Sequence, residues 1–205
     1  IETYLSFKGS NAEKLKQQFF DTLIDDPDNL NSRSAFYTAQ SYLDSGRLNE
    51  AIQWYRLYLN LRNTWNEEEY ECHLRIAGCL ISLKEQSYKI INELTEAINI
   101  FSDKAEAHYI LGKYYNNINQ FELAYFHLNK AYNCDLEKVK SNYILFIDER
   151  CYGKFIKDEL SVACYWLEKY DEGLQLVNDI IDDPDFEYDK ERITQNKKHF
   201  ENKIG

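Results

Sequence analysis

The sequence predicts an all-α fold, an α-solenoid of about four helical hairpins with capping helices at both ends. Turn residues are scarce: 7 Gly and 2 Pro among 205 residues are too few for a β-sandwich or barrel, which needs a chain breaker roughly every 8 to 12 residues. The small residues Ala39, Ala77 and Gly112 recur at offsets of 38 and 35 residues, near the period of about 34 expected for stacked helical hairpins. Amphipathic segments flank these repeats and would cover the apolar ends of the array.

The N-terminal cap is predicted over 1–30 and the first hairpin over 31–62. Within the cap, residues 11–24 place Leu15, Phe19 and Leu23 at four-residue spacing, an apolar stripe that one face of a helix would bury. In the first hairpin, Gly46 stands where a helix C-cap needs a positive φ. Both Pro residues mark helix stops, since Pro disfavours helical geometry in the residue before it; they lie in the triplets Asp26-Pro27-Asp28 and Asp183-Pro184-Asp185.

The third hairpin, over 104–133, shows the repeat pattern best. Its apolar and small residues fall at set offsets from Ala105, namely Leu111, Gly112, Tyr115, Phe121, Ala124, Leu128 and Ala131. This pattern resembles the tetratricopeptide repeat (TPR) at nearly every signature position. The resemblance implies a TPR-like α-solenoid, in which Gly112 and Ala124 face each other where the two helices cross.

The other elements are less regular. A looser second hairpin is predicted over 66–101, with Ile76, Ala77 and Leu80 on its first helix. An insert over 134–153 adds about fifteen residues to the ordinary period. A degenerate fourth hairpin over 154–183 follows, and a polar C-terminal capping helix over 187–205 carries Ile193 and Phe200 on one stripe.

Charge and cysteine content exclude several classes of partner. The net charge of −11 and the pI of about 4.9 leave no basic surface for phosphate backbones, so we expect no nucleic acid. No apolar run approaches the roughly 20 residues of a membrane span. The five Cys residues lack any C-x-x-C pair and are expected to be reduced thiols of a cytoplasmic protein. Met is absent even at position 1, which we interpret as a piece of a longer polypeptide.

A second resemblance covers nearly the whole chain. Segments 26–29, 34–42, 51–55, 65–68 and 75–77 look like the helical-repeat region that follows the catalytic domain in certain family 2 glycosyltransferases of bacteria and giant viruses. Segments 145–152, 158–163 and 170–173 are similar to the C-terminal part of the same family. The catalytic domain of that family alternates strands and helices, and no such segment occurs here. The resemblance therefore implies the non-catalytic tail of such an enzyme.

We assign no residue to catalysis, to a cofactor or to a metal ion. The two D-x-D triplets could hold a divalent cation, but their position at helix ends favours a role in terminating the helices. The four His residues never form H-x-x-x-H or H-E-x-x-H, which disfavours zinc. There is no Gly-rich phosphate loop and no G-x-S-x-G. A catalytic site assembled from scattered residues stays an alternative that nothing in the sequence favours.

The candidate binding surface is the concave face, which the first helix of each TPR hairpin lines with positions 2, 5, 9, 12 and 13. These positions hold a mixture of aromatic and polar side chains that suits an extended peptide; the candidates are Arg33, Phe36, Gln40, Asp44, Tyr109, Lys113 and Asn116. We expect no structural duty for them, and we expect Phe36 and Tyr109 to be binding hot spots. Phe36 and Gln40 stand where the chaperone-binding members of the repeat family carry a carboxylate clamp of Lys and Asn, so that ligand is not expected.

The sequence thus predicts a protein-interaction or scaffolding domain, not an enzyme. We expect it to be the C-terminal region of a family 2 glycosyltransferase that positions the catalytic domain, the acceptor or a partner. The alternative is a stand-alone adaptor that binds a peptide motif in its groove. Expected partners are a protein or peptide, the parent enzyme's own catalytic domain, or a second copy of the chain. Most of the 17 Tyr, 11 Phe and 3 Trp are assigned to the core.

Overall fold

The computed structural model describes residues 2–25 and 32–205, with side chains from residue 10 to 24 and from 32 onward. The described residues are all helical or loop, and they contain no strand. The chain divides into two compact units, residues 1–101 and 102–205. Each unit is described by itself.

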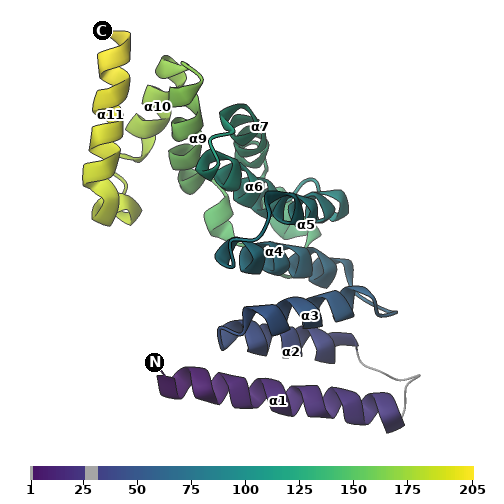
Figure 1. Cartoon of the computed structure of the whole chain (residues 1–205). Helices are drawn as coiled ribbons and strands as arrows, with labels where there is room; N and C mark the ends of the chain where they lie inside the picture. The colour runs from purple at the N-terminus through teal and green to yellow at the C-terminus, as the bar shows by residue number, and fades with distance from the viewer. Residues whose placement is uncertain (1, 26–31) are drawn as a thin grey trace. The chain divides into compact units, whose positions relative to one another are not determined.

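The first unit contains a long helix followed by two hairpins (Figure 1). Helix α1 packs against α2, each hairpin packs its two helices side by side, and α3 packs against α4. The helices are α1 (Glu2–Asp25), α2 (Ser32–Asp44), α3 (Leu48–Leu59), α4 (Asn66–Ser82) and α5 (Ser87–Ile100).

The second unit contains two further hairpins, an insert between them and a final helix. The α6–α7 hairpin meets α9 through both of its helices, and α11 packs against α10. The elements are α6 (Ala105–Asn117), α7 (Phe121–Tyr132), α8 (Leu136–Asn142), the short 3-10 helix η2 (Glu149–Cys151), α9 (Lys154–Trp166), α10 (Tyr170–Ile180), the 3-10 helix η3 (Pro184–Asp189) and α11 (Lys190–Ile204).

The turn inside each hairpin has the same backbone geometry. Two residues after the first helix ends, one residue takes a positive φ: Gly46 at 77°, Lys84 at 54°, Asn119 at 59° and Glu168 at 59°. The next amide donates to a carbonyl five residues back at 2.9 Å in every case, the hydrogen bond of a Schellman C-cap. The positive φ predicted at Gly46 is confirmed, and the other three hairpins hold non-Gly residues in this conformation.

At the close helix crossing in the third hairpin, the atoms nearest to an added side chain at Gly112 belong to Leu128. A Cβ atom on Gly112 would lie 2.5 Å from Cγ of Leu128 and 3.1 Å from the Leu128 backbone nitrogen. Leu128 is one helical turn beyond Ala124, and both are fully buried. Any side chain at residue 112 would therefore collide with Leu128.

The insert is ordered and covers the start of α6. Lys104, directly before α6, is 0% exposed and donates from Nζ to the carbonyl oxygens of Phe146 at 2.9 Å and Leu145 at 3.4 Å. The Tyr143 hydroxyl donates to Asp103 at 2.6 Å. Buried polar groups need partners of this kind, so the insert is an integral part of the second unit.

Each terminal helix buries an apolar stripe, and the stripe on α1 is narrower than the sequence predicts. On α1, Phe19 is 2% exposed and meets Trp54 edge to face at 5.2 Å, whereas Leu23 of the predicted stripe is 38% exposed. On α11, Ile193 and Phe200 are both buried. Among the residues whose side chains are described, no helix combines the length and apolar character needed to cross a bilayer.

Candidate functional site

Three of the four candidate groove residues of the first unit lie on the surface of α2. The Arg33 guanidinium is 2.7 Å from the Glu68 carboxylate of α4, and it lies 5.9 Å from the ring of Tyr37 and 5.8 Å from that of Trp65. Gln40 is half-buried and Asp44 is exposed. Arg33 thus already joins the first helices of two successive hairpins.

Phe36 is a core residue, so the prediction that it has no structural duty is wrong. Its side chain is 2% exposed and its ring lies edge to face with Tyr55 at 5.9 Å and with Tyr58 at 5.7 Å. Both Tyr residues belong to α3. Position 5 of this hairpin therefore points between α2 and α3, and a partner on the surface cannot reach the ring.

The candidates of the second unit meet α9. Lys113 Nζ is 3.1 Å from Glu159 Oε1, and the Asn116 amide nitrogen donates to the backbone and side-chain oxygens of Glu159 at 2.9 and 3.2 Å. Asn116 is 8% exposed and acts mainly inside the unit, against our prediction for it. Tyr109 is half-buried, and burial raises the pKa of its hydroxyl group.

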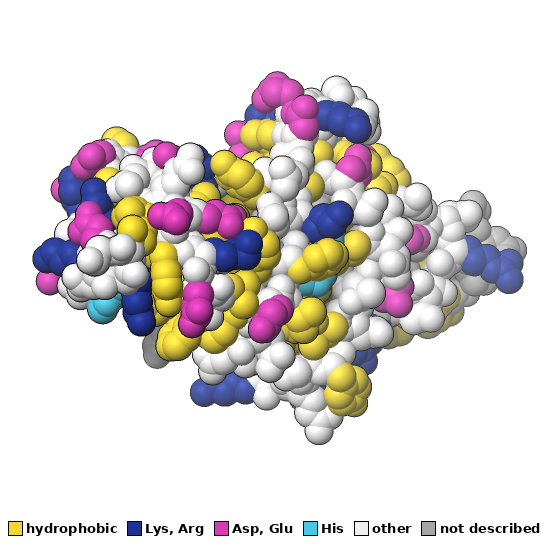
Figure 2. Space-filling view, turned by 90° about the horizontal axis from the view of Figure 1, so that it is seen from above, with side chains coloured by type: hydrophobic (Ala, Val, Ile, Leu, Met, Phe, Trp, Pro, Cys, Tyr) yellow, Lys and Arg dark blue, Asp and Glu magenta, His cyan; other side chains and the backbone are white. Residues whose placement is uncertain are grey.

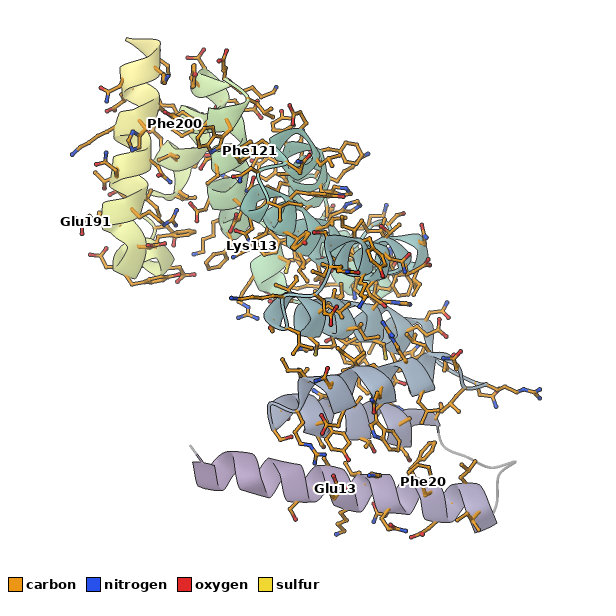
Figure 3. The ribbon with its side chains drawn as sticks, in the orientation of Figure 1. Glu13, Phe20, Lys113, Phe121, Glu191 and Phe200 are labelled. Carbon is orange, nitrogen blue, oxygen red and sulfur yellow. The ribbon has the colours of Figure 1, made fainter. Side chains whose placement is uncertain are left out.

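Tyr109 and Lys113 form one wall of a polar hollow of about 230 Å³. The opposite wall comes from η3 and α11, and the floor is α9. Half of the lining residues are charged; besides Tyr109 and Lys113, the lining consists of Phe155, Asp158, Glu159, Val162, Phe186, Tyr188, Asp189 and Arg192. Lys113 is labelled on α6 in Figure 3, and Glu191, one residue from Arg192, points away from this side of α11.

Arg192 forms ion pairs with two carboxylates that line the polar hollow. Its Nη2 atom is 2.8 Å from Oδ2 of Asp158 and 2.6 Å from Oδ2 of Asp189, and its Nη1 atom donates to Asp158 Oδ1 at 3.1 Å. Hydrogen bonds to Asp158 and then Asp189 raise the pKa of the guanidinium, and the hydrogen bond from Arg192 lowers the pKa of Asp189. One cation therefore lies between two carboxylates.

An apolar hollow of about 360 Å³ adjoins the polar one. Val162 lines both, so the two hollows form one continuous surface along α9, which we call the α9 groove. The apolar part is lined by Ser161, Val162, Tyr165, Trp166, Asn196, His199 and Phe200. Hydrophobic side chains are exposed among charged ones over this end of the second unit in Figure 2, which views it from above.

Trp166 is the most exposed of the aromatic side chains in the apolar part. It is 59% exposed, and its ring stacks on Phe121 of α7 at 5.1 Å with an interplanar angle of 12°. The floor beside it is fixed, because Phe200 is 2% exposed and packs against Tyr165 at 5.5 Å. A rigid, half-exposed indole beside an apolar hollow is a typical anchor point for a protein partner.

The groove positions of α9 are absent from the candidates predicted from the sequence, although the TPR position rule identifies them. Counting from Lys154, positions 2, 5, 9, 12 and 13 of the fourth hairpin are Phe155, Asp158, Val162, Tyr165 and Trp166. All five line the α9 groove. The position count from Lys154 was therefore the signal in the sequence that could have identified this site.

Two other clusters of polar side chains lie outside the groove. Asp183 and Asp185 each lie 2.7 Å from Lys154 Nζ, so this D-x-D triplet binds a lysine. The other triplet lies outside the described residues. His108 and His127 face each other across the α6–α7 hairpin with their Nδ1 atoms 3.0 Å apart. Among the residues with described side chains, no group of three or more His, Cys, Asp or Glu is arranged to hold a metal ion.

Comparison with known proteins identifies the fold but no family. No family model matches the chain, and a search of curated proteins finds no match either. Among solved structures, the crystal structure of MamA protein matches with a TM-score of 0.52 and 16% identity over 99% of this chain and 93% of that chain. A second MamA structure, titled MamA AMB-1 P212121, matches with a TM-score of 0.52 and 14% identity over 86% of this chain and 92% of that chain. MamA contains TPRs, so the chain has the TPR-like α-solenoid fold that the sequence predicts.

Proposed function

We propose that this chain is a non-catalytic protein-interaction module that holds an extended segment of a partner in the α9 groove. The observation that carries the proposal is the coincidence of two independent patterns. The five concave-face positions of the fourth hairpin, defined by the repeat alone, are the residues that line the polar and apolar hollows. The groove thus lies where a TPR-like hairpin presents its ligand-binding face.

The chemistry of the groove supports binding over catalysis. Its cations are engaged by carboxylates, Lys113 by Glu159 and Arg192 by Asp158 and Asp189. Its apolar part offers a large exposed ring, Trp166, on a rigid helix. Aromatic anchors next to well-packed apolar surface supply most of the affinity in protein interfaces.

We also propose, on the sequence resemblance alone, that the module is the C-terminal region of a family 2 glycosyltransferase, where the groove would hold the catalytic domain, the acceptor or a partner. A stand-alone adaptor fits the TPR-like fold equally well. The sequence of the parent reading frame separates the two: an α/β glycosyltransferase domain ahead of Ile1 supports the first, and its absence from the complete reading frame contradicts it.

A reducing, cytoplasmic compartment is part of the proposal. All five cysteines are free, and Cys72, Cys79, Cys151 and Cys164 are buried. Burial raises the pKa of the Cys72, Cys79 and Cys164 thiols, which keeps them protonated and unreactive. Fractionation of the native host, with the chain detected by antibody, tests the location; recovery from an oxidising compartment contradicts it.

Selection from a random peptide display library tests the binding function. The purified chain is the target, and the enriched peptides are titrated against the unmodified chain, Trp166→Ala and the control Tyr88→Ala. Tyr88 is 65% exposed, similar to Trp166, but lies on α5 of the first unit. We expect Trp166→Ala to weaken binding at least tenfold and Tyr88→Ala to leave it unchanged. Failure to enrich any peptide, or enriched peptides that bind Trp166→Ala normally, contradicts the proposal.

A further inference from the structure

The geometry of the α9 groove points to a specific class of ligand: a short extended segment with an apolar or aromatic residue and a basic residue three positions apart. The inference rests on the proposed function, since it names the partner chemistry of the same site. It follows from the unequal character of the two ends of the groove and from the distance between them. Both the character of the two ends and their separation are properties of described side chains on α6, α9, η3 and α11.

The polar end carries one more negative charge than positive. Lys113 and Glu159 form a neutral pair at 3.1 Å. Arg192 is a single cation in contact with two carboxylates, those of Asp158 and Asp189. A lysine or arginine of the ligand would balance the excess charge, whereas an aspartate or glutamate would increase it.

An exposed aromatic ring at the same end favours a cation independently. Tyr188 lines the polar hollow next to Asp189 and is 82% exposed. The face of a tyrosine ring attracts ammonium and guanidinium groups. Carboxylates with an excess negative charge and an accessible ring face thus occur together, and both are complementary to a cationic side chain.

The apolar end is complementary to a hydrophobic side chain. Val162, Tyr165 and Trp166 line it from α9, and Phe200 lines it from α11. Its polar lining groups, Asn196 and His199 on α11 and Ser161 on α9, carry no carboxylate. The Ser161 hydroxyl already donates to the Asp158 carbonyl at 2.7 Å. An apolar or aromatic ligand residue is therefore expected to insert beside Trp166.

The spacing of the two ligand residues follows from helix geometry. The acidic floor at Asp158 and the apolar floor at Tyr165 are seven residues apart on α9, or about 10 Å at 1.5 Å per residue. A peptide extended in the polyproline II conformation advances about 3.1 Å per residue and has three residues per turn, so residues three positions apart cover about the same distance and present their side chains on the same side. The predicted motif is therefore basic-x-x-apolar in one chain direction or its reverse.

Fluorescence anisotropy with labelled synthetic peptides tests the inference. On a Gly/Ser background, one peptide carries Lys and Phe three positions apart and a second carries them in the reverse order. Matched peptides replace Lys with Gln or with Glu, or replace Phe with Ser. Each is titrated against the full chain, Trp166→Ala, Tyr188→Ala, Asp189→Asn and Asp171→Asn. Asp171 is an exposed carboxylate on α10 outside the groove, so the last variant controls for the loss of one negative charge.

We expect one Lys/Phe order to bind at least threefold tighter than its Gln counterpart and tenfold tighter than its Glu and Ser counterparts. Asp189→Asn and Tyr188→Ala should each reduce the preference for Lys over Gln to near unity, and Asp171→Asn should preserve it. Tyr188 is almost fully exposed, so its substitution tests the site without risk to folding.

Two failures can be told apart. If display-selected peptides bind through Trp166 but show no preference for a basic residue, or prefer an acidic one, the ligand class is wrong and the binding function stands. If neither selected nor designed peptides respond to Trp166→Ala, the proposed function itself fails. Equal binding of the Lys, Gln and Glu peptides overturns the inference in either case.

Discussion

Gly173 of α10 lies directly against the ring of Phe200 in α11. A Cβ atom added at residue 173 would be 2.3 Å from Cε1 and 2.4 Å from Cζ of that ring, and 3.1 Å from Cβ of Cys164 on α9. The ring belongs to a core cluster with Val177, Ile180, Phe186 and Ile193. Figure 3 labels Phe200 on the side of α11 that faces α10. This contact fixes α11 beside α10, and α11 forms a wall of the α9 groove.

Gly173→Ala should therefore destabilise the protein, because the ring is confined and must shift. Overpacking of a core typically costs about 1 to 3 kcal/mol. The matched control is Gly78→Ala in α4, where an added Cβ has nothing within 4 Å; there the gain in helix propensity should stabilise by about 0.5 to 1 kcal/mol. Urea unfolding measures both, and equal stabilities for the two variants would contradict the packing at Gly173.

Phe36→Ala should unfold or severely weaken the first unit. Loss of a buried Phe costs about 3 to 5 kcal/mol, and Phe36 packs against Tyr55 and Tyr58. The adjacent Tyr37 is 48% exposed, so Tyr37→Ala should change the unfolding free energy by less than about 1 kcal/mol. Thermal unfolding followed by circular dichroism compares them. A Phe36→Ala protein as stable as the parent would contradict the assignment of Phe36 to the core.

The His108–His127 pair predicts a loss of stability in mild acid. Burial lowers the pKa of both imidazoles, and the pKa of His127 falls to about 4. The charge of Lys130 lowers the pKa of His108 further, and the charge of His108 lowers the pKa of His127 further. The unfolded chain binds these protons near pH 6.5 and the folded protein only at lower pH. The contribution of the neutral pair is thus complete above about pH 6.5 and declines as pH falls toward about 4.

Urea midpoints between about pH 7.5 and 5 measure this effect, which we expect to be about 1 kcal/mol after solvent screening of the half-buried His127. His127→Gln should reduce the pH dependence. His199→Gln, which changes an exposed histidine on α11, is the control. Identical pH profiles for the parent and His127→Gln would contradict the assignment.

Lys104→Met should loosen the insert. The substitution removes the ammonium donor from the part-buried carbonyls of Leu145 and Phe146, and an acceptor left unsatisfied away from water costs about 1 to 3 kcal/mol. Amide exchange over 143–153 should accelerate and proteases should cut there. Lys138→Met, at an exposed position of α8, should have neither effect. Unchanged exchange in Lys104→Met would show that the insert is held by other contacts.

The sequence predicted hairpins well because their packing repeats. Gly46 and Gly112 are where the repeat pattern demands a positive φ and a missing side chain. Side-chain direction was less predictable. The TPR position rule places Phe36 in the groove, yet its ring points inward and packs against two Tyr rings of α3. Nothing in the sequence marks Lys104 as buried, since its carbonyl partners lie 41 and 42 residues away in a segment without repeat character.

The α9 groove was predictable in part. The position rule that identified Tyr109 and Lys113 also selects Val162 and Trp166 once it is applied to the fourth hairpin. Its other wall was not predictable, because Arg192 reaches Asp158 across 34 residues of sequence. Only the three-dimensional path through η3 brings these two side chains together.

The indole N–H signals of the three tryptophans test the central claim most directly. In a ¹⁵N–¹H spectrum, Trp166 reports on the α9 groove, while Trp54, 8% exposed, and Trp65, 39% exposed, report on the first unit. Replacement of each Trp by Phe assigns its signal, and a display-selected peptide is then titrated into the labelled chain. If the groove is the binding site, the Trp166 signal moves with saturation and the other two stay in place. A peptide that binds while the Trp166 signal stays fixed, or that moves the Trp65 signal instead, contradicts the account.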